Sequence, residues 1–489
     1  MKSTYLFQSR SGNHYLFDKK QKIYVNIPPE QFFVFNHLEN NTEIPASVEK
    51  KDLDYYTRKY KFFKDNGFFS TLDSKKRFSA KISEDDIKYH LANLKQLTFE
   101  ITDKCNLNCT YCGYGHLYGD YDQRTGKNLD FSSVEKIFTD LIPYINSGFN
   151  ISPNDVMYIS FYGGEPLMNF DFIKKTVEYL TSIQIKKRIR FSMTTNATLM
   201  HKYMDFLIQN RFNLLISIDG DEKGNVYRHY HNGNPAFNKI IENIDLLLKK
   251  NPKYFEKYVS FNAVLHNKNN ESGILKFLKE KYGKIPSISP LNDSGIKKDA
   301  RFEFNRMFRN IDEYKLSLNE NYQHLKKDLF LNLPSFSAIS TFLIKNTKTF
   351  FQSIHRTFIN EDELVQTPTG TCIPFSKKIY VSVNGKLMFC ERIDHKFYVG
   401  EADSLNNAIP KIVNDFNRRI NRIEKQCQLC CINENCSQCM YYIENLEKSP
   451  KCNAFVNEKQ FMNYLSSIFS YLEENPNDID RIKNEVIID

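Results

Sequence analysis

The sequence predicts an α/β fold in three parts: a partial (β/α)6 barrel, a small winged-helix-like domain before it and a cysteine-rich domain after it. Three observations lead to this prediction. Strand-like and helix-like segments alternate through the middle of the chain, and three short strands followed by helices make up the N-terminal region. Eight of the 11 cysteines fall between residues 372 and 452.

Residues 1–95 have the pattern of a domain of their own. The runs TYLFQS, HYLFD and KIYVNI are rich in aromatic and β-branched residues and are separated by turn-like segments, which indicates three short strands. PPEQFFVFNHLEN follows, with an early proline and an acidic first turn that are typical of a helix start. A second amphipathic helix ends at Asn66 and Gly67. Strands followed by helices is a winged-helix-like order.

Residues 96–295 alternate between the two kinds of segment. The candidate strands cover residues 96–102, 156–163, 188–195, 212–219, 258–265 and 285–291. Repeated βα units predict parallel strands joined by crossover helices. Six units fit a partial, TIM-like barrel, whose active site is expected at the C-terminal ends of the strands.

The rest of the chain divides into three further segments. Residues 296–370 look mostly helical and charged, and we interpret them as a bridge between domains or a wall of a substrate cleft. Residues 371–455 form the cysteine-rich domain, and residues 456–489 have the pattern of closing helices.

Charge and hydropathy exclude some classes of function. The net charge of +9 is spread over 489 residues without lysine blocks, so we expect no nucleic-acid partner. No apolar run approaches the ~18 residues that a membrane span needs, so we expect a cytoplasmic protein without a membrane partner. Cysteines in such a compartment are better interpreted as metal ligands or redox groups than as disulfides.

The first cysteine group directly follows the first barrel strand. Cys105, Cys109 and Cys112 have the spacing CxxxCxxC. A tetrahedral zinc site needs four ligands, and His116 is near enough in sequence to be the fourth. A four-iron cluster held by three cysteines instead leaves one iron open for another ligand. The spacing alone is compatible with both sites.

Three more motifs follow successive barrel strands: GGEP at 163–166, TTNAT at 194–198 and SIDG at 217–220. Each alone could be an ordinary turn, helix cap or strand end. Together with CxxxCxYC, and in this order, they resemble the radical S-adenosylmethionine (radical SAM) superfamily. In that family the open iron binds the amino and carboxylate groups of S-adenosyl-L-methionine.

This resemblance implies a set of cofactor-binding residues. Gly163 and Gly164 would allow close backbone approach, and Glu165 would accept a hydrogen bond from the methionyl ammonium. Thr195 and Asn196 would meet the ribose, and Arg228 would pair with the cofactor's carboxylate. The remaining expected contacts are Tyr111 within CxYC, Ser217 at the end of the fourth strand, and Asn262, with Ala263, on the adenine side.

The second cysteine group contains paired CxxC units, which zinc ribbons also use. After a radical SAM barrel, the group is similar to a SPASM domain, which carries two auxiliary [4Fe-4S] clusters. The resemblance implies one cluster on Cys427, Cys430, Cys436 and Cys452, and a second on Cys372, Cys390 and Cys439. The run SVNGKLMFC indicates a hairpin that delivers Cys390.

The second cysteine group departs from the SPASM domains of sulfatase-maturing enzymes at two points. The cluster on Cys372, Cys390 and Cys439 lacks a fourth cysteine, so its fourth ligand stays open. Glu391 stands where those enzymes have a catalytic aspartate, and it could be a general base. We interpret the spare Cys431 as a small buried residue.

The resemblance implies an oxidoreductase that modifies peptides. An electron from flavodoxin or ferredoxin would cleave S-adenosyl-L-methionine to a 5′-deoxyadenosyl radical, which removes hydrogen from the substrate. The N-terminal domain is similar to the leader-recognition element of enzymes that mature ribosomally made precursor peptides, which adds the leader as a strand. The leading hypothesis is therefore a maturase that installs a thioether or carbon–carbon crosslink.

Two alternatives remain open. One is an anaerobic sulfatase-maturing enzyme that forms formylglycine, although those enzymes generally lack the N-terminal domain. The other is a zinc-stabilised peptide-binding scaffold without catalysis.

Overall fold

The computed structural model describes residues 1–318, 322–347 and 365–485. The chain forms two compact units. The barrel unit comprises residues 82–334 and 372–416, and the flanking unit comprises residues 1–81, 335–371 and 417–489. The described part of the chain contains no helix long and apolar enough to cross a membrane.

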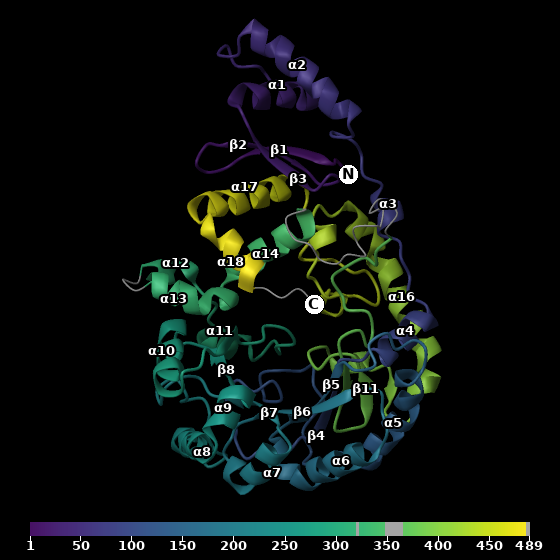
Figure 1. Cartoon of the computed structure of the whole chain (residues 1–489), viewed down its shortest axis with the longest axis vertical. Coiled ribbons are helices and arrows are strands. Elements are labelled where there is room, and N and C mark those ends of the chain that lie inside the picture. Colours follow the sequence, from purple (N-terminus) through teal and green to yellow (C-terminus); the bar gives the residue numbers. More distant parts are fainter. Residues whose placement is uncertain (319–321, 348–364, 486–489) are drawn as a thin grey trace. The chain divides into compact units, whose positions relative to one another are not determined.

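The core of the barrel unit is a parallel sheet (Figure 1). Its six barrel strands are β4 (Gln96–Thr102), β5 (Val156–Gly163), β6 (Arg188–Thr195), β7 (Asn213–Ser217), β8 (Val259–Leu265) and β9 (Ser287–Pro290). Each pairs in parallel with the next, which confirms the predicted fold class and its six strands to within a few residues at each end.

Crossover helices connect these strands, as the repeated pattern predicts. They are α5 (Ser132–Ile145), α6 (Phe170–Ser182), α7 (Met204–Gln209), α8 (Phe237–Lys250), α9 (Pro252–Tyr258) and α10 (Glu271–Tyr282), with α4 (Glu84–Ala92) before β4. Ile137, Phe138 and Leu141 of α5 are fully buried, as expected for an amphipathic helix that covers a sheet. The barrel unit also contains α11 (Arg301–Met307), α12 (Glu313–Ser317) and α13 (Tyr322–Leu329).

A hairpin from the cysteine-rich region extends the barrel sheet beyond β4. β10 (Ile379–Val381) pairs in parallel with β4 and antiparallel with β11 (Lys386–Met388), which in turn pairs with β12 (Gly400–Glu401). The turn at Asn384 and Gly385, where Gly385 has φ of +78°, confirms the predicted hairpin. The sequence did not indicate its pairing with β4. This pairing places Cys390 and Glu391 in the barrel unit.

The flanking unit contains a small antiparallel sheet in the order β1 (Thr4–Gln8), β2 (His14–Asp18), β3 (Ile23–Ile27). These are the three strands that the sequence predicts. α1 (Pro29–Asn40), α2 (Lys50–Asp65) and α3 (Ser74–Arg77) follow, and the C-terminal helices are α14 (Pro334–Asn346), the end of α16 (Leu405–Leu429), α17 (Glu458–Glu474) and α18 (Asn477–Glu485). α16 runs from one unit into the other.

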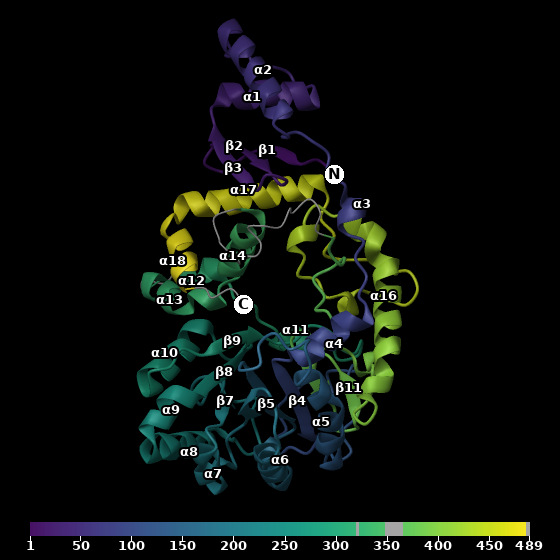
Figure 2. The same ribbon diagram turned by 45° about the vertical axis from the view of Figure 1, so that its right-hand side comes forward.

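Helices cover both faces of the small sheet (Figure 2). On one face, Leu6 and Leu16 form an apolar cluster with Phe35 of α1 and Tyr60 of α2. On the other face, aromatic side chains of the sheet contact α17: the ring of Tyr5 lies 4.9 Å from that of Phe461. The small sheet is therefore covered by α1 and α2 on one face and by α17, from the C-terminal part of the chain, on the other. For this reason the N-terminal region folds together with α17.

Candidate functional site

The three cysteines of the first group lie on the loop that follows β4, at the C-terminal edge of the barrel sheet. The Cys105, Cys109 and Cys112 thiols act on one another electrostatically. Burial raises the pKa of Cys105 to about 11 and that of Cys109 to about 12. The positive charge of Arg228 acts against the rise at Cys109. Arg124 donates from Nη2 to the Cys112 sulfur at 3.5 Å. The structure therefore brings the three predicted thiols together.

His116, the possible fourth zinc ligand, is engaged elsewhere. Its exposed Nε2 lies 2.9 Å from a carboxylate oxygen of Glu303. Throughout the ranges that the structure describes, no group of three or more His, Cys, Asp or Glu side chains is arranged to hold a single metal ion. A four-iron cluster is larger than one ion and spaces its thiolates more widely.

The GGEP motif docks directly onto the start of the cysteine loop. Gly163 has φ of +131°, and a Cβ there would lie 2.1 Å from the carbonyl oxygen of Thr102. A Cβ on Gly164 would lie 2.0 Å from that of Lys104. The amides of Gly164 and Glu165 donate to these same two carbonyls, each at 2.8 Å. Only glycine fits at the two positions, and the contact holds Glu165 beside the cysteine loop.

Glu165 joins the GGEP and TTNAT motifs. Its carboxylate is fully buried and accepts three hydrogen bonds: from the Thr195 hydroxyl at 2.7 Å, from the backbone N–H of Asn196 at 2.8 Å and from the backbone N–H of Leu167 at 3.1 Å. Burial raises the pKa of Glu165, the three hydrogen bonds oppose part of this rise, and the resulting pKa is about 7. All three donors are neutral, so the carboxylate lacks a cationic partner among them. A ligand ammonium is the kind of group that it would bind.

Asn196 connects this carboxylate site to the cysteine loop. Its Nδ2 lies 3.0 Å from Oδ1 of Asn106 and 3.9 Å from the Cys105 sulfur, and its Oδ1 accepts from the Thr198 amide and hydroxyl. Asn106 also donates to the Thr198 hydroxyl at 2.7 Å. The sequence did not single out Asn106 or Thr198, although both lie inside the quoted motifs.

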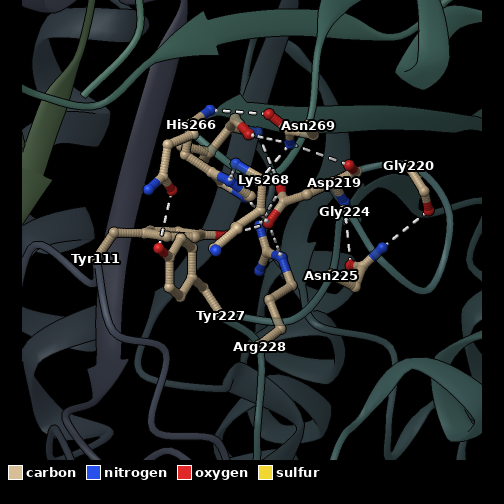
Figure 3. A network of polar contacts seen from close by, with 12 residues as sticks. Tyr111, Asp219, Gly220, Gly224, Asn225, Tyr227, Arg228, His266, Lys268 and Asn269 are labelled. Atoms are coloured by element: carbon tan, nitrogen blue, oxygen red, sulfur yellow. Dashed lines mark hydrogen bonds and ion pairs between the residues drawn. The ribbon is translucent and has the colours of Figure 1, made fainter. Parts of the chain in front are cut away.

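Asp219 organises the far side of the cysteine loop (Figure 3). Arg228 donates to it from Nε at 2.9 Å and from Nη2 at 3.1 Å, and the Tyr111 hydroxyl donates to Oδ2. The Val264 amide donates to Oδ1 at 2.9 Å, and His266 lies close by. Burial alone would raise the pKa of Asp219, but Arg228 and these donors lower it to about 2.

This network places two predicted residues, Tyr111 and Arg228, at a buried carboxylate that the sequence did not single out. The Arg228 guanidinium lies 5.5 Å from the Tyr111 ring centre and acts electrostatically on Cys109. The signal that could have revealed Asp219 was an acidic residue inside SIDG at the end of a buried strand. Asn269 donates to its backbone carbonyl at 3.1 Å and completes the network.

Ser217, the last residue of β7, pairs with Asn262 in the middle of β8. The structure thus places Ser217 at the same edge of the sheet as the cysteine loop, with Asn262 beside it. Their half-buried side chains leave room for a ligand contact.

Glu391 faces a cavity of about 390 Å³ inside the barrel unit. Lys378, just before β10, lies 3.0 Å from Oε1 of Glu391 and pairs with it. The buried Oε2 of Glu391 has no partner among the described residues. The other walls are largely polar and come from the barrel strands, including Ser160, Thr194 and Ser260. The carboxylate therefore has one oxygen held by a cation and one that is buried without a partner in the part of the chain that the structure describes.

Four cysteines of the second group come together in the flanking unit. Burial raises the pKa of Cys427 to about 12, with Cys436, Cys452 and Cys430 close enough to raise it further. The Val456 amide donates to the Cys430 sulfur at 3.4 Å, the kind of N–H···S contact that stabilises cluster thiolates. The spare Cys431 is buried, as predicted.

The other three cysteines of this group belong to different units. Cys372 and Cys390 lie in the barrel unit and Cys439 in the flanking unit. The residues next to Cys372 and Cys439 are joined, because the Met440 amide donates to the Thr371 hydroxyl at 2.7 Å. The shared site of the three cysteines stays a prediction.

Comparisons with known proteins agree with this geometry. The family profile of the radical SAM superfamily matches residues 99–280. A cysteine-type anaerobic sulfatase-maturating enzyme of Clostridium novyi is 25% identical over 269 residues, 52% of this chain and 67% of that protein. Radical SAM cyclopropyl synthase TigE of Paramaledivibacter caminithermalis is 23% identical over 183 residues, 35% of either chain.

The fold has a solved relative. The structure of native anSMEcpe with bound AdoMet and Kp18Cys peptide covers 80% of this chain and 99% of its own, with a TM-score of 0.54 and 18% sequence identity. At this identity the likeness shows a shared fold.

Proposed function

We propose that this chain, a radical SAM enzyme of the maturase type, installs a thioether or carbon–carbon crosslink in a ribosomally made precursor peptide. The observation that carries the proposal is an exposed edge strand of the small sheet in the flanking unit. β3 ends the small sheet, and its Ile23 and Val25 are each 38% exposed. An unpaired edge strand with exposed apolar side chains is a surface that accepts an added strand.

The residues around the cysteine loop fit the family's cofactors. Cys105, Cys109 and Cys112 would hold a [4Fe-4S] cluster and leave one iron for S-adenosyl-L-methionine. When S-adenosyl-L-methionine is bound to this cluster and one electron is added, the cofactor supplies a carbon radical able to take hydrogen from an unreactive C–H bond. We infer that flavodoxin or ferredoxin is the electron donor.

The chain's own part is to bind and orient the cofactor. Glu165, whose donors are all neutral, would accept a hydrogen bond from the methionyl amino group. Asn196 would reach the ribose, with Ser217 and Asn262 placed for contacts further along the cofactor. Because Asp219 already takes Nε and Nη2 of Arg228, the cofactor's carboxylate would meet Nη1.

Glu391 is the proposed general base. Lys378 holds one of its oxygens at 3.0 Å, and Glu391 is among the residues that line the cavity. A base is needed because removal of a hydrogen atom and an electron from a residue that forms a new bond also releases a proton. Two auxiliary [4Fe-4S] clusters, on the four flanking-unit cysteines and on Cys372, Cys390 and Cys439, would accept the electron.

The main alternative is formylglycine formation by an anaerobic sulfatase-maturating enzyme, the name that two relatives carry. The two are distinguished by co-expressing the chain with any small open reading frame found beside its gene and measuring peptide masses. Loss of two hydrogens from a linked residue pair supports the crosslinking proposal. An aldehyde at a single Cys or Ser would contradict it. A colourless, iron-free protein after anaerobic purification would instead favour the zinc-stabilised scaffold.

A further inference from the structure

Lys19 is a buried lysine directly after β2 in the flanking unit. Its side chain is 1% exposed. The ammonium donates to the carbonyl oxygen of Cys431 at 3.1 Å and to Oδ1 of Asn433 at 2.8 Å, and it lies 4.0 Å from a carboxylate oxygen of Glu434. A fully buried lysine is rare, and this one has its oxygen acceptors on a single loop, with the Met1 sulfur as a further acceptor at 3.7 Å.

The charges around Lys19 do not cancel. Glu434 also pairs with Arg77, whose Nη1 lies 3.0 Å from the same oxygen, and both side chains are nearly buried. Two cations thus share one carboxylate, which leaves one positive charge in excess. The carboxylate of Asp18, also buried, lies outside these ion pairs and accepts from the hydroxyls of Ser3 and Thr4. An excess buried charge is costly unless an opposite charge lies nearby.

The loop that receives Lys19 is the one that carries the flanking-unit cysteines. Cys431 and Asn433 lie between Cys430 and Cys436, and Cys430 and Cys431 both act electrostatically on the ammonium. Two buried N–H groups here, Nε of Arg77 and Nδ2 of Asn433, have no hydrogen-bond partner in the described structure. Excess positive charge and spare donors suit an anion. A four-iron core with four thiolates carries net negative charge.

We propose that Lys19 is a positioning residue that raises the reduction potential of a [4Fe-4S] cluster on Cys427, Cys430, Cys436 and Cys452. The inference rests on the auxiliary cluster proposed above. Reduction adds one negative charge to the cluster, so a fixed cation nearby stabilises the reduced form more than the oxidised form. Lys19 directly follows β2 of the sheet proposed to bind the leader, so this region would supply a charge to an electron acceptor of the reaction.

The test isolates this cluster in the full-length chain. The background variant changes to alanine the cysteines of the other two proposed clusters: Cys105, Cys109, Cys112, Cys372, Cys390 and Cys439. After anaerobic reconstitution, the iron content and a potentiometric titration followed by electron paramagnetic resonance are measured with and without Lys19→Met. We expect the reduced-to-oxidised ratio at the background's midpoint to fall at least tenfold, a shift of about 59 mV for a one-electron couple.

Three further variants make the test specific to buried charge. Lys19→Arg keeps the charge and should restore the midpoint. Glu434→Gln increases the excess positive charge and should move the midpoint the opposite way. Lys61→Met removes an exposed lysine of α2 and should leave the midpoint unchanged, because water screens that charge.

The outcomes separate the two proposals. If iron is bound and neither Lys19→Met nor Glu434→Gln moves the midpoint, the role of Lys19 is overturned while the auxiliary cluster stands. If the background variant binds no iron, the auxiliary cluster itself is overturned, and the role of Lys19 with it.

Discussion

Asp219 is the single residue on which most contacts of the cofactor side converge. It holds Arg228 and Tyr111 in place and is itself fixed by the Val264 amide. Replacing a buried carboxylate that pairs with a buried guanidinium leaves that cation without a counter-charge.

Asp219→Asn should therefore lower the free energy of unfolding by about 3–5 kcal/mol, the range for breaking a buried ion pair from one side. Chemical denaturation under anaerobic conditions measures this. Asp221→Asn is the matched control, because Asp221 is exposed two residues away. Equal stability of the two variants would show that the buried pair contributes little.

Glu165 makes a prediction about pH. Its pKa of about 7 lies above the ordinary value, so near neutrality the ligand-free protein holds a proton there that the unfolded chain does not. Stability from this group is therefore present at low pH and is lost as pH rises toward about 7. The ionised carboxylate is the stronger acceptor for the N–H groups of the cofactor's amino group, so the affinity for the cofactor changes with pH in the opposite sense.

The affinity for S-adenosyl-L-methionine should rise about tenfold per pH unit below about pH 7 and then level off. Anaerobic titration calorimetry of the reconstituted protein measures it. Glu165→Gln should bind more weakly and lose this protein-derived pH dependence. An unchanged pH profile in that variant would mean that the ammonium binds elsewhere.

Glu391→Gln separates base chemistry from cofactor chemistry. Since Glu391 lies in the cavity rather than among the contacts of Glu165 and Asp219, 5′-deoxyadenosine formation should persist, while modified peptide falls by about 10²–10⁴-fold. Quantitative mass spectrometry of both products in one reaction measures the ratio. A parallel loss of both products would assign Glu391 a structural role instead.

At the scale of elements, the edge of β3 carries the leader-binding proposal. Deleting residues 1–95 is a poor test, because it would expose the aromatic face of α17 that packs on the small sheet. The double variant Ile23→Asp and Val25→Asp changes only side chains that are already exposed.

We expect this double variant to weaken precursor binding at least tenfold without changing cofactor cleavage, since charges on an edge strand oppose strand addition. Fluorescence anisotropy with a labelled precursor gives the affinity. Ile151→Asp is a control, because Ile151 is 68% exposed on the barrel unit. The same affinity in all three proteins would remove the leader-binding role of β3.

Elements with a clear period were predictable from the sequence, and pairings between distant segments were not. The six barrel strands follow from repeated apolar runs separated by amphipathic helices. The addition of β10 to β4 pairs Ile379 with Leu97, residues almost 300 positions apart. A pattern within a short stretch of sequence cannot indicate such a pairing. Short strands of three residues also leave little periodicity to detect.

The same distinction applies to the site. The cysteines, glycines and Glu165 were predictable because each belongs to a short motif. Asp219 and Lys378 were not singled out, because their importance comes from burial and from partners that the fold supplies. Lys19 is the extreme case, since one lysine of the turn-like run KKQK gives no sign that it will be buried against a cysteine loop.

At the scale of the whole molecule, the proposed function divides the work between the two units. The barrel unit brings together the cysteine loop, Glu165 and Asp219, and it contains the cavity with Glu391. The flanking unit combines a small sheet that has an exposed edge with four clustered cysteines. Cofactor cleavage belongs to the first unit, so it should not require the leader.

The central claim is that the first cysteine group supports reductive cleavage of S-adenosyl-L-methionine. The direct measurement is 5′-deoxyadenosine formed after anaerobic reconstitution and reduction with dithionite, quantified by liquid chromatography and mass spectrometry. We predict formation by the parent chain and none above background when Cys105, Cys109 and Cys112 are changed to Ala. Equal formation by the variant, or no formation by an iron-loaded parent, would contradict the account.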